Sequence, residues 1–192
     1  MKSFLLSSIL ALALAGSAEA KGFYVGAYGG ANWDNVIDVP FVKENTGTVI
    51  GGVVGTTIDA VPGLRVEADL NYRQNDVDIF GGVITANDET WGLLGNVVWD
   101  IPALQMGRVQ PYVLAGAGYA NHTATFEDIS VLELSHGGVA WQLGAGANYK
   151  IADNVSLGVG YRYFQGPNLE VLGTELSDGS NHSVIATVNF AF

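Results

Sequence analysis

Two serine–histidine neighbours are the residue pairs that could support nucleophilic catalysis: Ser135 with His136, and His182 with Ser183. A histidine that activates a serine must lie within hydrogen-bonding reach of its hydroxyl. Ser135 and His136 precede a segment in which polar and apolar residues alternate, and His182 and Ser183 lie within another. Neighbours on such a strand point to opposite faces. Neither pair therefore forms a nucleophile–base contact by itself. A contact with a serine of another segment stays an alternative, but solvated side chains are the favoured interpretation, and we assign no catalytic residue.

Histidines and acids are also common metal ligands, but their spacing here matches no metal motif. His122, His136 and His182 lack the ligand spacing of zinc sites, and the chain has no D-x-D-x-D-G calcium loop. We therefore expect no metal and no cofactor. The acids instead gather in four polar segments whose only basic residue is Lys43, which favours a solvated surface over divalent-cation bridging to an anionic partner. They are Asp34, Asp38, Glu44, Asp76, Asp78, Asp88, Glu89, Glu127, Asp128, Glu133, Glu170, Glu175 and Asp178.

Eight segments with a period of two residues must position these side chains. In the clearest of them, the third, apolar residues alternate with charged ones, which is typical of a strand with two unlike faces. The last is so apolar that both of its edges must be paired, and closing a barrel with the first strand achieves this. The segments are 23–33, 48–58, 64–74, 89–100, 109–120, 139–150, 155–165 and 180–192.

The connections between these segments alternate in length. Residues 59–63, 101–108 and 151–154 form short turns. Short periplasmic turns and longer outer loops are the pattern of an outer-membrane barrel. We therefore predict an all-β fold, an eight-stranded antiparallel up-and-down transmembrane β-barrel. The longer connections are 34–47, 75–88, 121–138 and 166–179.

Paired aromatic residues indicate which face of the strands meets lipid. Trp91 and Trp99 share a face eight residues apart, and so do Trp141 and Tyr149. Eight residues of a tilted strand rise about 20 Å, close to the ~25 Å apolar band that aromatic girdles flank in such barrels. We therefore predict that these four residues form an aromatic girdle. The alternative is a core stripe of a soluble sandwich.

Charges on the inward face of the third segment need partners, because a barrel of eight strands has a narrow interior and buried charges are costly unless paired. Arg162, on the inward phase of the seventh segment, faces the third segment across the lumen. We predict an ion pair between Arg162 and Glu67 or Asp69. Tyr24 and Tyr28 are expected to pack beside this pair. The other inward charges of the third segment are Arg65 and Arg73.

Glycines on the inward phase of the sixth and seventh segments are expected to make room for large side chains from other parts of the wall. The remaining inward positions are expected to be polar, which disfavours an open apolar lumen for a small ligand. These glycines are Gly144, Gly146, Gly158 and Gly160.

The composition agrees with a membrane barrel and excludes several other classes. The chain has 192 residues, of which 48% are hydrophobic and only 14% charged, and its mean hydropathy is +0.26. A net charge of −11 argues against a nucleic-acid partner. The absence of cysteine excludes disulfides. Residues 1–20, with Lys2, an apolar run and a small-x-small site ending at Ala20, are expected to be a cleaved export signal, leaving 21–192 as one barrel domain.

Five motifs give the chain a family resemblance. It resembles the small outer-membrane β-barrel proteins of Gram-negative bacteria, the OmpA-type transmembrane domain and the opacity-type surface antigens. The resemblance covers residues 21–192 and implies a location in the cell outer membrane after export through the periplasm. It rests on F-Y-V-G-A-Y-G-G at 23–30, L-R-V-E-A-D-L-N-Y-R at 64–73, P-Y-V-L-A-G-A-G at 111–118, L-G-V-G-Y-R-Y at 157–163, and the closing strand with Phe192.

The resemblance also implies partners and roles for particular residues. Phe190 and Phe192 match the C-terminal aromatic signal that the outer-membrane insertion machinery recognises in that family. Outer-membrane lipid and lipopolysaccharide are the other implied partners. Glu67 matches an inward acid that takes part in a gating ion pair in OmpA-type barrels. The basic partner there corresponds to the part of the seventh strand where this chain has Gly158 and Gly160, so a static plug is expected instead of a gate.

These observations favour a structural or surface-exposed outer-membrane barrel with a mostly filled interior, and weak porin-like passage of small solutes stays open. The alternative is a lipid-modifying enzyme or a small-ligand binder on the same scaffold. An enzyme should show a convergent serine, histidine and acid at one rim, and no spacing in this chain predicts one. We therefore expect that the protein is not an enzyme.

Overall fold

The computed structural model describes residues 22–34, 42–44, 46–79, 84–126, 132–167, 169–171, 174–177 and 179–192. The expected export signal, 1–20, lies outside these residues. The described part is almost entirely β-strand, with a single short 3-10 helix, η1 (Pro102–Leu104). No helix among the described residues is long and apolar enough to span a membrane.

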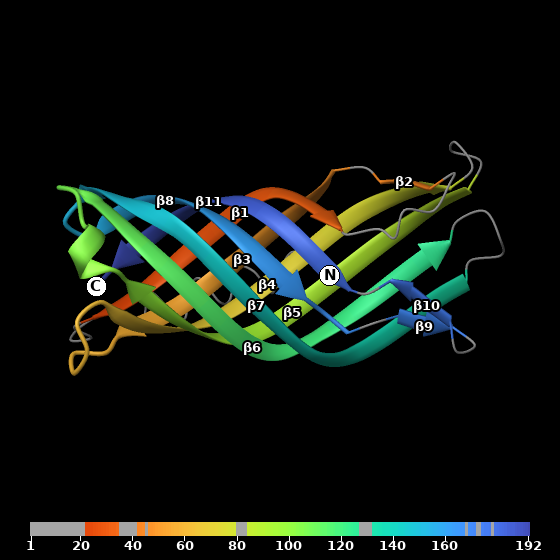
Figure 1. The fold of residues 1–192 in the computed structure, drawn as a ribbon, viewed down its shortest axis with the longest axis horizontal. Coiled ribbons are helices and arrows are strands. Elements are labelled where there is room, and N and C mark those ends of the chain that lie inside the picture. The colour runs from red at the N-terminus through yellow and green to blue at the C-terminus, as the bar shows by residue number, and fades with distance from the viewer. Residues whose placement is uncertain are drawn as a thin grey trace.

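Eight long strands form a closed antiparallel barrel (Figure 1). Each strand pairs with its neighbours in the chain, and β1 also pairs with β11, from Tyr24 opposite Ala191 to Asp34 opposite Asn181. This seam closes the sheet, as the apolar last segment predicts. The long strands are β1 (Phe23–Asp34), β3 (Gly47–Thr57), β4 (Leu64–Ile79), β5 (Ile84–Asp100), β6 (Val109–Phe126), β7 (Leu132–Ala152), β8 (Val155–Gln165) and β11 (Ser180–Ala191).

Three short strands lie at one end of the barrel. β2 (Val42–Glu44) pairs with the outer part of β4, and β9 (Leu169–Val171) pairs with β10 (Thr174–Ser177). Figure 1 shows them at the end opposite the C-terminus. In an outer-membrane barrel, whose longer loops lie outside the cell, this end would face the exterior.

The eight predicted strands are confirmed, but four of them extend further outward than the prediction. β4 and β5 remain paired as far as Ile79 opposite Ile84, and β6 and β7 as far as Phe126 opposite Leu132. The prediction ended these strands where the alternation of apolar residues ends. Beyond the membrane no lipid enforces that alternation, while backbone groups still require hydrogen-bond partners. The hairpins therefore continue with residues that are mostly polar.

The turn between β3 and β4 shows how the chain reverses at the periplasmic end. Gly63 has a φ of +81°, a conformation that residues with a Cβ rarely adopt. Its carbonyl accepts a hydrogen bond from the Asp100 amide at 2.8 Å. The Pro62–Gly63 dipeptide therefore supplies the dihedral angles of the turn and anchors it to the end of β5.

The outward face of the barrel is apolar, as the aromatic spacing predicts. The girdle residues Trp91, Trp99, Trp141 and Tyr149 are between 40% and 48% exposed. Between them the aliphatic side chains of this face are also exposed, with Leu93 at 53%. A soluble sandwich would bury this stripe, so the lipid-facing interpretation holds.

Candidate functional site in the barrel lumen

Asp69 lies at the centre of the lumen, on the inward face of β4, and is fully buried. Its Oδ2 accepts hydrogen bonds from Nη1 of Arg162 at 2.7 Å and from Nε2 of Gln142 at 3.1 Å. Its Oδ1 accepts one from the Tyr28 hydroxyl at 2.7 Å. The amides of two further residues donate to the same carboxylate at 3.3 and 3.4 Å: Asn96 and Asn71. Asp69 therefore joins side chains from several strands into one network.

Arg162 reaches Asp69 from β8, on the opposite wall of the barrel. Its guanidinium carbon lies 4.2 Å from the centroid of the Tyr28 ring, a cation–π distance. A Cβ at Gly144 would lie 3.3 Å from Cγ of Arg162, so that glycine leaves room for the side chain. Of the two acids that the sequence suggests for Arg162, the structure places Asp69 against it.

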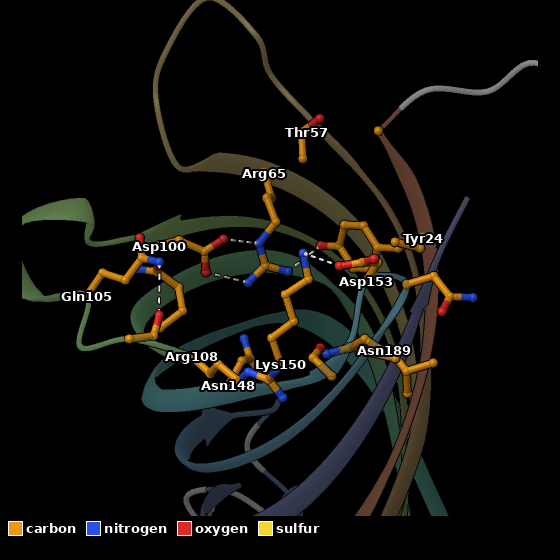
Figure 2. A pocket seen from close by; sticks show the side chains of 18 residues that line it. Tyr24, Thr57, Arg65, Asp100, Gln105, Arg108, Asn148, Lys150, Asp153 and Asn189 are labelled. Carbon is orange, nitrogen blue, oxygen red and sulfur yellow. Dashed lines mark hydrogen bonds and ion pairs between the residues drawn. The ribbon is translucent and has the colours of Figure 1, made fainter.

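Glu67, the inward-facing residue of β4 that precedes Asp69, belongs to a second charged layer nearer the periplasm. Its Oε1 accepts hydrogen bonds from the Tyr24 hydroxyl at 2.6 Å and from Nη1 of Arg65 at 3.0 Å. Arg65 also donates to both carboxylate oxygens of Asp100, at 2.8 and 2.9 Å. Figure 2 shows Arg65 between Asp100 and Tyr24. Tyr24 therefore packs beside this lower layer, whereas Tyr28 packs beside Arg162.

A cavity of about 390 Å³ opens below this layer at the periplasmic mouth. Asn148, Asn189 and Lys150 line it (Figure 2). A second cavity of about 20 Å³ lies further in, against Tyr112. Arg65 lines both cavities, so its ion pairs lie between the mouth and the interior.

Above Asp69 further buried side chains of the described residues occupy the lumen. Arg73 hydrogen-bonds to Asn71, and its guanidinium carbon lies 3.8 Å from the centroid of the Phe164 ring. Next outward, Asn32 is fully buried. It hydrogen-bonds at 2.7 to 3.0 Å to side chains of β4 and β11: Asn75, Asn181 and Ser183. This layer joins both sides of the seam between β1 and β11.

Inward glycines make room for tyrosines, as the sequence predicts for Gly146 and Gly160. A Cβ at Gly146 would lie 2.7 Å from the hydroxyl of Tyr112, and Gly160 lies against the same hydroxyl. Two further tyrosine–glycine pairs, on β1 and β3, escaped the prediction because the phase of β3 is ambiguous in a glycine-rich sequence. They are Tyr24 with Gly55 and Tyr28 with Gly51.

The expectation that the other inward positions are polar is wrong. Three small apolar clusters lie inside the barrel, each beside a polar layer. Aliphatic side chains fill the spaces between the hydrogen-bonded groups, because buried polar groups occupy only positions where partners are available. The aliphatic members larger than alanine are Val49, Val53, Ile185, Leu94, Val98 and Leu114.

The serine–histidine neighbours separate as strand geometry predicts. Ser183 points inward and donates a hydrogen bond to Asn32 at 2.8 Å. His182 points outward, where its Nδ1 contacts the Tyr161 hydroxyl. Ser135 hydrogen-bonds to Asn121 at 2.9 Å. Neither neighbouring pair forms a nucleophile–base contact.

The third histidine, His122, lies inside the upper lumen, buried, with its Nε2 2.7 Å from Oδ1 of Asp88. Among the acids of the outer segments, Asp88 and Glu89 have described side chains; those of the other acids fall outside the described part. Across the described residues, no group of three or more His, Cys, Asp or Glu side chains is placed to hold a metal ion.

Gln142 and Asn96 are the network members that the sequence analysis missed. Gln142 is fully buried and donates to both Asp69 and the Asn96 side-chain carbonyl, the latter at 2.8 Å. The alternation of outward and inward positions along each strand could have identified both residues as inward-facing. Each follows an outward-facing position in a strand whose girdle aromatics had already fixed the outward face.

Comparison with known proteins identifies the family. A model of the outer membrane protein beta-barrel domain matches residues 3–192, and the chain belongs to this family. It is therefore an outer-membrane β-barrel protein, located in the cell outer membrane.

Two curated relatives agree with this assignment. The outer membrane protein PagN of Salmonella typhimurium is 25% identical over 89% of this chain and 87% of its own length. An outer membrane protein of Gluconacetobacter diazotrophicus is 30% identical over 61% of this chain, and the match spans about a third of its length, 33%. Among solved structures, Neisserial surface protein A superimposes with a TM-score of 0.65 at 18% identity, over 91% of this chain and all of that one, which supports the fold.

Proposed function

We propose that the protein is a structural, surface-exposed barrel of the outer membrane whose lumen is closed, so that it neither conducts solutes nor catalyses a reaction. The observation that carries this proposal is the filled interior. Arg65 is paired at the lower layer, Asp69 and Arg162 at the centre, and Asn32 at the outer layer. The central pair joins opposite walls of the barrel, and the layers below and above it join neighbouring strands. Together these layers support a lumen without a continuous aqueous path for a small solute.

The relatives support the same proposal. They carry the names of outer-membrane proteins, and none of those names denotes an enzyme. The serine–histidine neighbours point to opposite sides of the wall and offer no nucleophile activated by a base. The surface that this barrel presents outside the cell is acidic in sequence, and Lys43 is the only basic residue in its four outer segments.

Conductance across a planar bilayer tests the closed lumen. The refolded protein should give no steady current above the baseline of the lipid. Asp69→Ala with Arg162→Ala removes the central pair but leaves the paired Arg65 below it and the Asn32 layer above it, so this variant should also stay silent. Tyr149→Phe, on the outer surface, is the control and should stay silent. Steady steps of equal size in the unaltered protein and the double variant would contradict the proposal.

We also propose that Phe192 contributes to recognition by the insertion machinery. Its side chain is 41% exposed, and its amide donates to the Phe23 carbonyl at 2.9 Å. Phe192→Ala keeps that backbone bond and removes only a half-exposed ring, so refolding in detergent should change little. The amount of folded protein in the outer membrane should fall severalfold. Equal loss in cells and in micelles would indicate a purely structural ring.

A further inference from the structure

An aromatic cluster on the outer surface of the barrel surrounds His182. The residues come from four adjacent strands, β1, β11, β8 and β7, and we call them the His182 platform. The register places Trp33, His182 and Tyr163 side by side in one row. The platform consists of Trp33, Trp141, Tyr161, Tyr163 and His182.

The rings of the platform contact one another in sequence. Trp33 stacks on His182 with centroids 6.5 Å apart and planes 13° from parallel. The His182 ring meets Tyr163 edge-on at 5.2 Å, and Tyr163 meets Trp141 at 5.3 Å. Tyr161 lies 5.9 Å from His182, and its hydroxyl contacts Nδ1 of that ring. These contacts hold the imidazole in one orientation.

The position of the platform fixes the part of the bilayer that it meets. Trp141 belongs to the outer aromatic girdle, and Trp33, Trp141 and Tyr161 are between 36% and 43% exposed. Girdle aromatics lie at the level of the lipid headgroups. An imidazole with a hydrogen-bonding edge is costly in hydrocarbon, so His182 also belongs at the headgroup level of the outer leaflet.

Two indole N–H groups and one imidazole nitrogen of the platform lack a partner in the protein. In the tautomer in which the Tyr161 hydroxyl donates to Nδ1, Nε2 of a neutral His182 ring carries the proton and is a donor. Across the described residues, Nε2 of His182 and the indole nitrogens of Trp33 and Trp141 make no hydrogen bond. These groups are therefore open to partners from outside the chain, such as water or a lipid headgroup.

We infer that the His182 platform binds the phosphate-bearing sugar headgroup of an outer-leaflet glycolipid. Flat aromatic rings offer apolar surface to the C–H faces of a sugar. The free N–H groups donate to phosphate oxygens, and hydrogen bonds to a charged acceptor are stronger than neutral ones. No platform residue carries an acidic side chain that would repel a phosphate.

A second aromatic pair on the same surface provides a matched control. Trp91 and Tyr119 lie 6.1 Å apart on β5 and β6, with similar exposure. Trp91 is a girdle residue like Trp141, but this pair has no histidine. General affinity of the girdle for lipid should therefore appear equally at both places, whereas the proposed recognition should appear only at the platform.

Native mass spectrometry of the refolded protein tests the inference. Diphosphorylated lipid A and phosphatidylglycerol are offered together in detergent, and the lipid retained on the barrel is counted. Lipid A carries a sugar and a second phosphate that phosphatidylglycerol lacks, so the unaltered protein should prefer lipid A by about tenfold, the size expected for one additional hydrogen bond to a charged group. His182→Phe keeps a ring but removes the donor, and the preference should fall to about twofold or less. Trp91→Phe should keep the full preference.

Each other outcome overturns the inference. Equal loss in His182→Phe and Trp91→Phe would assign the effect to the girdle as a whole. Equal retention of the two lipids by the unaltered protein would make the platform an ordinary lipid contact. A dimer that His182→Phe converts to a monomer would make the platform a contact between two copies. Altered gel mobility on boiling confirms that each variant is folded before it is compared.

Discussion

Asp69→Asn should lower the free energy of unfolding of the barrel by about 3–5 kcal/mol, the cost of leaving one partner of a buried ion pair without its counter-charge. The substitution keeps the size of the side chain but removes the charge that Arg162 faces at 2.7 Å. The Arg162 guanidinium is buried on the far wall and cannot turn to water. Equilibrium unfolding in urea, followed by tryptophan fluorescence in detergent micelles, measures the change.

A double-mutant cycle isolates the pair from the rest of the network. Asp69→Asn and Arg162→Met together should cost about 2 kcal/mol less than the sum of the single changes, because the second change removes the stranded charge. Glu67→Gln is the matched control, since Glu67 bonds to Arg65 in the layer below. It should couple much more weakly to Arg162→Met. Additive effects of Asp69→Asn and Arg162→Met would mean that the pair contributes nothing.

Gly118→Ala should destabilise the barrel by about 3 kcal/mol, at the upper end of what overpacking costs. A Cβ at this inward position would lie 2.6 Å from Cα of Leu94, on the neighbouring strand. The obstacle is backbone, and both β5 and β6 are paired along two edges, so neither strand can move aside. The urea midpoint should fall, and less protein should refold at a given time.

Gly95→Ala provides the control on the adjacent strand. Gly95 is paired with Ala117 in the register and is exposed, and the nearest atom to an added Cβ lies 3.9 Å away. Its effect should stay within about 1 kcal/mol and favour folding, because alanine restricts the unfolded chain. Equal destabilisation by both substitutions would show that strand glycines matter for flexibility and not for clearance.

The sequence predicts the strands and their lipid-facing side better than it predicts the side-chain contacts inside the barrel. Alternation identifies the eight strands and their lipid-facing side, because lipid imposes one kind of residue on every second position. The pairing of Arg162 with Asp69 and of Arg65 with Glu67 could not be chosen in advance. Glu67 and Asp69 share one face of β4, and the choice between them depends on how the strands are staggered around the barrel. No local pattern in the sequence specifies that stagger.

The inward aliphatic positions were missed for a related reason. Val98 and Leu114 belong to strands whose outward faces are also apolar, so alternation by hydrophobicity disappears there. In such strands only the girdle aromatics indicate which positions face outward. The prediction made the outer hairpins too short because it located strands by the alternation of apolar residues. Only the part of a strand that lies in the membrane needs that alternation.

The seam between β1 and β11 has a consequence for how the protein reaches its native state. It joins the two ends of the described chain through a register from Tyr24 opposite Ala191 to Asp34 opposite Asn181. Pairing residues so distant in sequence carries the largest loop-closure entropy in the molecule and is typical of slow folding. Until it forms, both terminal strands expose unpaired edges that invite aggregation. The seam is therefore expected to be the last interface to close and, once closed, to make unfolding cooperative and slow.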